Sequence, residues 1–150
     1  MHVLGGSYFE RCEYPTWNEF FGSGGRAAIA ARTFTTVRLH TCADAKAERN
    51  LNLLSDVYDV QVRSTRIARS VRFRYFHSLA TPDIDYLSRG ARPLIEVRGK
   101  AILRFGMVEA ETVAHGDRVV YDPQSGDLSR PFEENGSTAG ELAIAESPRT

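Results

Sequence analysis

Three glycines among four residues, Gly22, Gly24 and Gly25, run directly into an alanine-rich segment without a helix breaker. Glycine lets a ligand approach the main chain closely, and alanine has the highest helix propensity. A glycine-rich turn that leads into a helix presents free N–H groups and the positive end of the helix dipole. The pattern predicts a site for hydroxyl groups or anions, although a closely packed helix start without a ligand gives the same spacing.

Other kinds of catalytic or metal chemistry find little support in the residues. The four histidines are scattered without the spacing of metal ligands, and no Gly-x-Ser-x-Gly or Walker-type motif is present. Cys12 has no evident histidine partner for nucleophilic catalysis. Glu109 and Glu111 form a carboxylate pair of the kind that usually lies on the surface. We therefore predict no catalytic residue and no metal site in this chain.

Composition describes a globular protein of about one domain. The 150 residues are 42% hydrophobic and 25% charged, with 19 Lys and Arg balancing 19 Asp and Glu. A neutral chain has no electrostatic basis for holding a polyphosphate backbone, so nucleic acid is not the expected main partner. The N-terminus does not resemble a signal peptide, and no apolar run reaches membrane-spanning length. With Cys12 and Cys42 expected as free thiols, we predict a cytoplasmic protein without a membrane partner.

The first third of the chain alternates between strands and helices. Val3 and Leu4 predict a short buried strand that ends at Gly5 and Gly6. A helix is expected over 25–33, a strand over 35–41 and a second helix over 45–55. This order predicts a parallel sheet flanked by helices. The aromatic stretch before Gly22 is either an edge strand or a pocket wall, with core packing the more common role.

Two later segments, 60–64 and 71–76, alternate between apolar and charged residues, as in an exposed antiparallel sheet. We interpret their arginines as a solvated face. Val71, Phe73 and Tyr75 share the apolar face, which needs a cover from a second copy or another segment. Further strands are expected over 94–97, 100–109 and 117–124, with at most a short helix between the last two. Residues 125–137 are turn-rich, 139–145 predict a short helix or strand, and the tail is expected to fray.

Taken in order, several stretches resemble the N-terminal part of a ribokinase-like (PfkB) carbohydrate kinase. They are Gly5-Gly6 after the first strand, Gly22-Ser23-Gly24-Gly25-Arg26-Ala27-Ala28, Cys42-Ala43-Asp44, and Val119-Val120-Tyr121-Asp122-Pro123. The resemblance implies an α/β fold: one domain over 1–150 with a three-layer core, a parallel central sheet and a small β lid. The lid strands would fall near 14–22 and 58–77, and the glycine-rich loop would hold substrate hydroxyls.

The chain also departs from the family pattern. Arg26 stands where the family has Asn, and Glu10 is the nearest match to an early acidic substrate contact. The Asn-x-x-Glu and Gly-Ala-Gly-Asp motifs are absent, and the second of these supplies the family's catalytic base. The resemblance is therefore to the substrate half of a kinase. We expect no phosphoryl transfer by this chain alone, and ATP and Mg²⁺ only where a C-terminal half is supplied.

The predicted substrate site combines the loop with its neighbours, namely Glu10, Gly22, Ser23, Gly24, Gly25 and Arg26. The guanidinium of Arg26 favours a ligand with a phosphate or carboxylate, unless it pairs with Glu10 or Glu13 and only ties the loop to the first strand. Gly24→Val is expected to abolish binding and leave the fold nearly intact.

Two functions remain open from the sequence. The chain binds a sugar, nucleoside or phosphorylated ligand, as a truncated kinase or as a subunit completed by another chain. Alternatively it is a non-catalytic interaction protein that forms a homo-oligomer through its lid.

Overall fold

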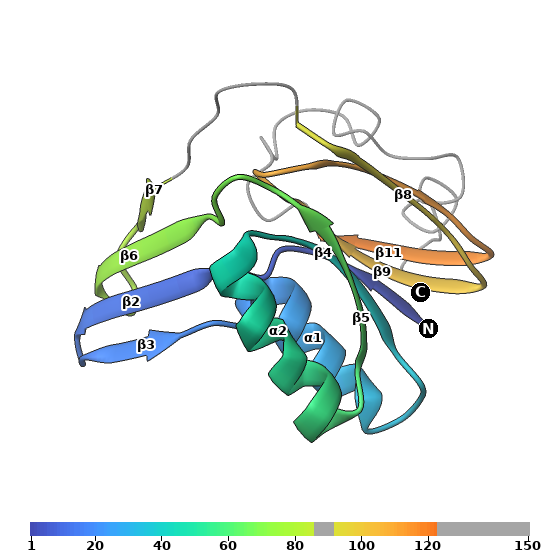
Figure 1. Ribbon diagram of the computed structural model, residues 1–150, viewed down its shortest axis with the longest axis horizontal. Helices are drawn as coiled ribbons and strands as arrows, with labels where there is room; N and C mark the ends of the chain where they lie inside the picture. The colour runs from blue at the N-terminus through green and yellow to red at the C-terminus, as the bar shows by residue number, and fades with distance from the viewer. Residues whose placement is uncertain (86–91, 123–150) are drawn as a thin grey trace, which may run out of the picture.

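A five-stranded parallel sheet forms the centre of the molecule (Figure 1). The computed structural model describes residues 1–85 and 92–122. The first strand is the middle of the sheet, with Val3 and Leu4 fully buried. From one edge to the other the strands are β11 (Arg118–Asp122), β9 (Ala101–Phe105), β1 (His2–Leu4), β4 (Arg38–Ala43) and β5 (Gln61–Arg66). The predicted α/β class with a parallel central sheet is confirmed.

Two helices, α1 (Gly22–Arg32) and α2 (Ala45–Tyr58), cover one face of this sheet (Figure 1). The core between them and the sheet contains Val3, Leu39 and Leu54. Helix α2 begins after Asp44, whose carboxylate accepts hydrogen bonds from the backbone N–H groups of Lys46 and Ala47. This N-cap fixes the turn between β4 and α2. Neither helix is long and apolar enough to cross a membrane, judged over the described residues.

The opposite face of the central sheet is covered, in the described part of the chain, by two parallel strands, β8 (Leu94–Arg98) and β10 (Glu111–His115) (Figure 1). Apolar side chains of these strands pack on Leu4, Cys42, Ile102 and Val119. Strand β10 lies where the sequence predicted at most a short helix. A β carbon on Gly116 would lie 2.4 Å from the carbonyl oxygen of Gly99, so the turns after β8 and β10 stack backbone against backbone. All five residues of β10 pair with β8, so this segment completes a strand pair and not a helix.

Four further strands form the lid beside the central sheet. Their order is β3 (Trp17–Glu19), β2 (Phe9–Tyr14), β6 (Arg72–His77) and β7 (Asp83–Asp85). Strands β2 and β6 are parallel to each other, so the lid sheet is mixed, whereas an antiparallel one was expected. The lid therefore begins at Phe9, earlier than the predicted 14–22.

The second predicted lid segment is only partly right. Residues 61–66 form β5, which pairs along its whole length with β4 in the central sheet. A strand at the edge of a parallel sheet can be half exposed, and β5 shows the alternating pattern that was expected of an antiparallel strand. The lid segment starts only at Arg72. The predictions for 125–137, 139–145 and the tail lie outside the described residues.

Candidate functional site

The glycine-rich segment is the first turn of α1, and it packs against the loop that follows β1. A β carbon on Gly24 would lie 2.6 Å from the carbonyl carbon and oxygen of Gly5. Gly22 has a φ of +56°, and its β carbon would lie 2.5 Å from the carbonyl oxygen of Gly6. Glycine is required at both positions because two stretches of backbone meet there without room for a side chain.

The N–H groups of this turn already have acceptors within the protein. The amide of Ser23 donates to the Tyr8 hydroxyl at 3.3 Å. The amide of Gly24 donates to the Gly6 carbonyl at 3.0 Å, and that of Gly25 to the Phe21 carbonyl at 2.9 Å. The prediction that these groups are free for a ligand is therefore wrong. The turn positions Tyr8 and the first loop, and it does so as a closely packed helix start.

Glu10 and Arg26, two of the predicted site residues, lie together. The Arg26 guanidinium forms an ion pair with the Glu10 carboxylate, which is only 5% exposed. A second carboxylate, that of Glu19, lies 3.7 Å from the same guanidinium. Glu13, the other partner considered for Arg26, instead pairs with Arg11 at 3.0 Å. The charge of Arg26 is therefore matched by two carboxylates, as in the alternative in which Arg26 pairs with Glu10 or Glu13.

One face of the lid carries the Glu10 and Glu19 carboxylates beside aromatic rings. The register places Glu10 opposite Phe73 and Cys12 opposite Tyr75, so all four share a face. The Tyr75 hydroxyl donates to Glu10 at 3.4 Å. Burial and the nearby Glu10 carboxylate raise the pKa of Tyr75 to about 12, so this hydroxyl stays a donor at neutral pH.

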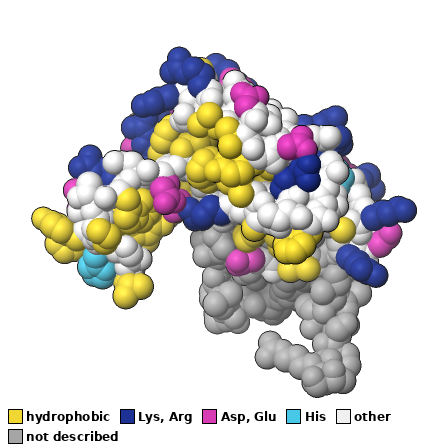
Figure 2. All heavy atoms as spheres, turned by 90° about the horizontal axis from the view of Figure 1, so that it is seen from below, with side chains coloured by type: hydrophobic (Ala, Val, Ile, Leu, Met, Phe, Trp, Pro, Cys, Tyr) yellow, Lys and Arg dark blue, Asp and Glu magenta, His cyan; other side chains and the backbone are white. Residues whose placement is uncertain are grey.

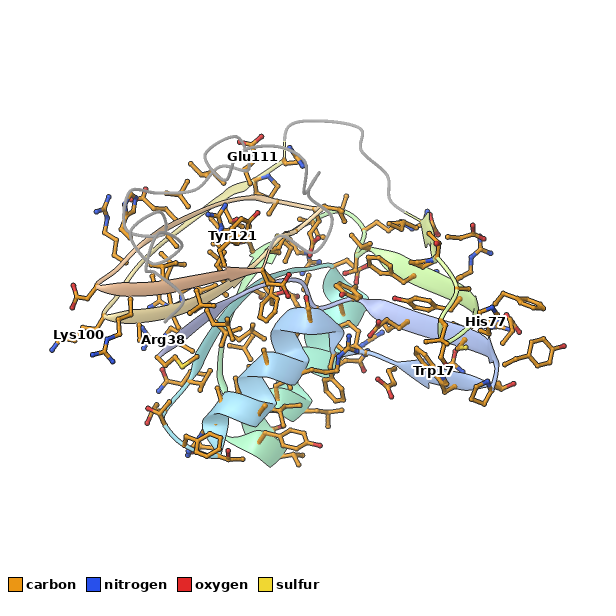
Figure 3. The ribbon with its side chains drawn as sticks, turned by 180° about the vertical axis from the view of Figure 1, so that it is seen from behind. Trp17, Arg38, His77, Lys100, Glu111 and Tyr121 are labelled. Atoms are coloured by element: carbon orange, nitrogen blue, oxygen red, sulfur yellow. The ribbon has the colours of Figure 1, made fainter. Side chains whose placement is uncertain are left out.

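Rings that follow each other along the lid continue this aromatic surface. The Tyr8 and Phe73 rings lie 4.3 Å apart, centroid to centroid. The Trp17 and Tyr75 rings are 5.9 Å apart. Trp17 lies at the lid end of the molecule, far from Arg38 and Lys100 at the opposite end (Figure 3). Aromatic faces beside carboxylates are suited to the CH faces and hydroxyl groups of a polyol.

A cavity of about 290 Å³ separates this lid face from the segment that follows β9. Its lining from the lid side includes Tyr8, Phe73, Tyr75, Pro82 and Ile84, and from the core side Gly106, Met107, Val108 and Glu109. The position of a β carbon on Gly6 is 3.1 Å from the Glu109 carboxylate. The cavity thus lies at the carboxyl ends of the parallel strands, the usual place for a ligand in an α/β sheet.

Glu109 is the functional residue that sequence reasoning missed. Its side chain is 4% exposed although it was interpreted as half of a surface pair with Glu111. Burial raises the pKa of Glu109 to about 7, against the opposing effect of hydrogen bonds from the backbone N–H groups of Glu109 and Val108. Burial, with the charge of Glu109, also raises the pKa of the Cys42 thiol to about 12. The available signal was its place at the end of the strand predicted over 100–109; in the structure β9 ends at Phe105 and Glu109 follows four residues later.

Folding raises the pKa of Glu109 from 4.5 to about 7. Across this pH window the folded chain keeps a proton that the unfolded chain releases. The free energy of unfolding should therefore fall as the pH rises from 4.5 to 7, and stay at the lower level above it. Glu109→Gln should remove this fall, worth up to about 3 kcal/mol, and be more stable than the parent at pH 8. Urea unfolding across this pH range measures the effect.

Glu111→Gln is the matched control, because the Glu111 side chain is 61% exposed. It should leave the pH profile of the parent unchanged. A Glu109→Gln profile that follows the parent at every pH would show that Glu109 ionises normally in the folded chain.

The described residues hold no group of three or more His, Cys, Asp or Glu side chains placed to bind a metal ion. His2 Nδ1 and His40 Nε2 lie 2.9 Å apart. Burial, with the charges of His2, Arg38 and Arg63, lowers the pKa of His40 to about 4. The pair is thus neutral at physiological pH, and it lies at the amino end of the central sheet, away from the cavity.

Neither a family model nor a curated protein sequence matches the chain. Solved structures do match. One is a pyrophosphate-dependent kinase in the ribokinase family, complexed with a pyrophosphate analogue and myo-inositol, at 14% identity and a TM-score of 0.53, covering 75% of this chain and 42% of that one. A second is a pyrophosphate-dependent myo-inositol-1 kinase converted into a myo-inositol-3 kinase. It matches at 14% identity and a TM-score of 0.52, covering 75% of this chain and 41% of that one. A third is a sulfate complex of a pyrophosphate-dependent kinase in the ribokinase family. It matches at 15% identity and a TM-score of 0.51, covering 79% of this chain and 43% of that one.

These structures show that the chain has a ribokinase-like fold, as the resemblance in the sequence implied. The chain spans less than half the length of each of these three structures.

Proposed function

We propose that the chain is the substrate-binding part of a ribokinase-like sugar, cyclitol or nucleoside kinase. It holds a small polyhydroxylated ligand between the lid and the central sheet. The observation that carries this proposal is the cavity itself: about 290 Å³, walled by aromatic rings and containing the buried carboxyl of Glu109. This volume is at the lower end for small-molecule sites, so the ligand is about the size of one sugar ring.

The ion pairs of Arg26 disfavour a ligand that carries a negative charge. A phosphate or carboxylate on the ligand was expected because Arg26 supplies a permanent charge. That charge is matched by Glu10 and Glu19. An anion would have to displace a buried carboxylate, so a ligand without negative charge fits the site better.

The expectation that this chain alone transfers no phosphate rests on a sequence motif of the family. The base and the anion hole of the family belong to its Gly-Ala-Gly-Asp motif, which the chain lacks. A phosphate donor and Mg²⁺ would be held by a second half of the fold. We expect the purified chain to bind its polyol and to transfer no phosphate to it. As both described cysteines are free thiols, a reducing cytoplasm is the proposed location.

Thermal unfolding with myo-inositol tests the binding proposal. A ligand at 100 times its dissociation constant stabilises the folded chain by about 2.7 kcal/mol, so the melting temperature should rise with concentration. Phe73→Ala removes a wall of the cavity and should abolish the rise. Phe34→Ala is the control, because Phe34 is 90% exposed in the turn that follows α1. If myo-inositol, glucose, ribose and adenosine all leave the melting temperature unchanged, the binding proposal fails.

The lid also supports the second candidate function, assembly through its outer surface. Large hydrophobic side chains are exposed there, with Tyr14 at 66%, Phe76 at 67% and Leu79 at 93%. Hydrophobic side chains are visible on the lid, at the lower left of Figure 2. Phe73, expected to be covered by a second copy or by another segment of the chain, lines the cavity and packs on Tyr8.

Phe76→Asp tests assembly without altering the cavity, whereas a change at Phe73 would alter the cavity wall as well. If a second copy covers the lid, light scattering should give a dimer mass for the parent and a monomer mass for Phe76→Asp. Leu53→Asp, on the exposed face of α2 where Leu53 is 49% exposed, should keep the dimer. A parent chain that is monomeric at high concentration would rule out assembly through the lid.

A further inference from the structure

The cavity between the lid and the core contains one ionisable carboxyl group among its described lining residues, that of Glu109. Its hydrogen bonds come from the main chain at Glu109 and Val108. Within residues 1–85 and 92–122, no Lys, Arg or His forms an ion pair with it. A buried carboxylate without a cation is costly. A ligand that supplied a positive charge would remove that cost.

The rest of the wall fits a cation as well. Tyr8, Phe73 and Tyr75 line the same cavity. The Tyr8 and Phe73 rings lie 4.3 Å apart and are tilted by 41° to each other. Aromatic faces attract cations through their quadrupole, and aromatic cages are a common way to recognise ammonium groups. Rings and a buried carboxylate in one cavity provide both parts of such a site.

The charge of Arg26 does not cancel this preference. Arg26 pairs with the carboxylates of Glu10 and Glu19, and the Tyr75 hydroxyl donates to Glu10. Among the described residues that line the cavity, Glu109 is the one with a charged side chain. A phosphate on the ligand would meet repulsion from Glu109, and an ammonium group would meet attraction.

We propose that the cavity selects a polyol that carries an ammonium group, such as an aminocyclitol or an amino sugar, with Glu109 as its counter-ion. This inference rests on the proposed function and names the class of ligand for the same site. The raised pKa of Glu109 supports this proposal, because an adjacent cation would stabilise the ionised form of a carboxyl that titrates near neutral pH. Burial raises the pKa of the Cys42 thiol and of the Tyr75 hydroxyl to about 12, so these two groups keep their protons at neutral pH.

A matched pair of probes tests the proposal: scyllo-inositol, and scyllo-inosamine, in which one hydroxyl is replaced by an amino group. Isothermal calorimetry with the full chain at pH 8 should give about tenfold tighter binding for the amine, the scale of a charge-assisted hydrogen bond. In Glu109→Gln, which keeps the shape of the side chain, the two affinities should become nearly equal. Glu111→Gln is the control and should keep the tenfold difference.

The outcomes separate this inference from the proposed function. Equal affinities of the parent for the two probes would overturn the inference and leave the polyol site standing. An amine preference that survives in Glu109→Gln would overturn the role of Glu109. Binding of neither probe, nor of any neutral polyol, would overturn both. Thermal melting of each variant confirms that it is folded. If Glu109→Gln is unstable, Phe73→Leu provides the second test. This change removes one ring and keeps an apolar wall, and it should reduce the amine preference.

Discussion

Gly24→Val should prevent the chain from folding, and loss of ligand binding would only be a consequence. A β carbon at this position would lie 2.6 Å from the backbone carbonyl of Gly5, and backbone atoms cannot move aside as a flexible side chain can. Overpacking costs about 1–3 kcal/mol and in some cases more; we expect the upper end here because backbone blocks the new side chain, and this is a large part of the total stability of a domain. Circular dichroism and urea unfolding of the purified variant measure the loss.

The neighbouring glycine provides the control. A β carbon on Gly25 would meet the Phe21 side chain at 3.1 Å and a Leu54 methyl at 3.8 Å. Gly25→Ala thus faces side chains that can adjust, and it gains helix propensity of up to about 1 kcal/mol. It should fold and melt close to the parent. A well-folded Gly24→Val chain that has lost only ligand binding would support the original prediction from the sequence, a ligand loop.

Arg26→Ala should destabilise the fold by about 2 kcal/mol, the cost of leaving a buried charged group without its partner. Glu10 is 5% exposed, and removal of Arg26 leaves its carboxylate with the weak hydrogen bond from Tyr75. The cost stays moderate because Arg26 is itself 48% exposed, so water can replace part of the guanidinium. Urea unfolding at neutral pH gives the free energy directly.

Two further variants isolate the cause. In Arg26→Ala with Glu10→Gln the buried charge is gone, and most of the lost stability should return. Arg11→Ala breaks the ion pair between Arg11 and Glu13, whose side chains are 57% and 45% exposed respectively. That change should cost less than about 1 kcal/mol. If Arg26→Ala melts like the parent but weakens binding of an anionic ligand, Arg26 is a ligand contact after all.

The order of elements in the first third of the chain was predictable because local patterns determine it. A short buried strand before paired glycines, an alanine-rich helix and a β-branched strand each have a clear signal. Strand β5 was placed in the wrong sheet because alternation reports only that one face is exposed. Which sheet the strand joins depends on its pairing with β4, a contact between distant residues.

The site was harder to predict than the fold. Glycine spacing indicated a close approach at Gly24, but the group that approaches is the backbone of Gly5, and composition cannot distinguish that from a ligand. Glu10 and Arg26 were correctly placed together. Glu109 was missed because its importance comes from burial against Gly6 and Tyr8, which are about a hundred residues earlier in the chain.

A small polyol is expected to bind between the lid and the segment after β9. A titration of ¹⁵N-labelled chain with myo-inositol, followed by NMR, tests it most directly, because each backbone amide reports its own position. We expect the largest shifts on residues that line the cavity, namely Tyr8, Phe73, Tyr75 and residues 106–109. Shifts that gather at the opposite end of the sheet, around Arg38 and Lys100 (Figure 3), or no shifts at saturating myo-inositol, would contradict it.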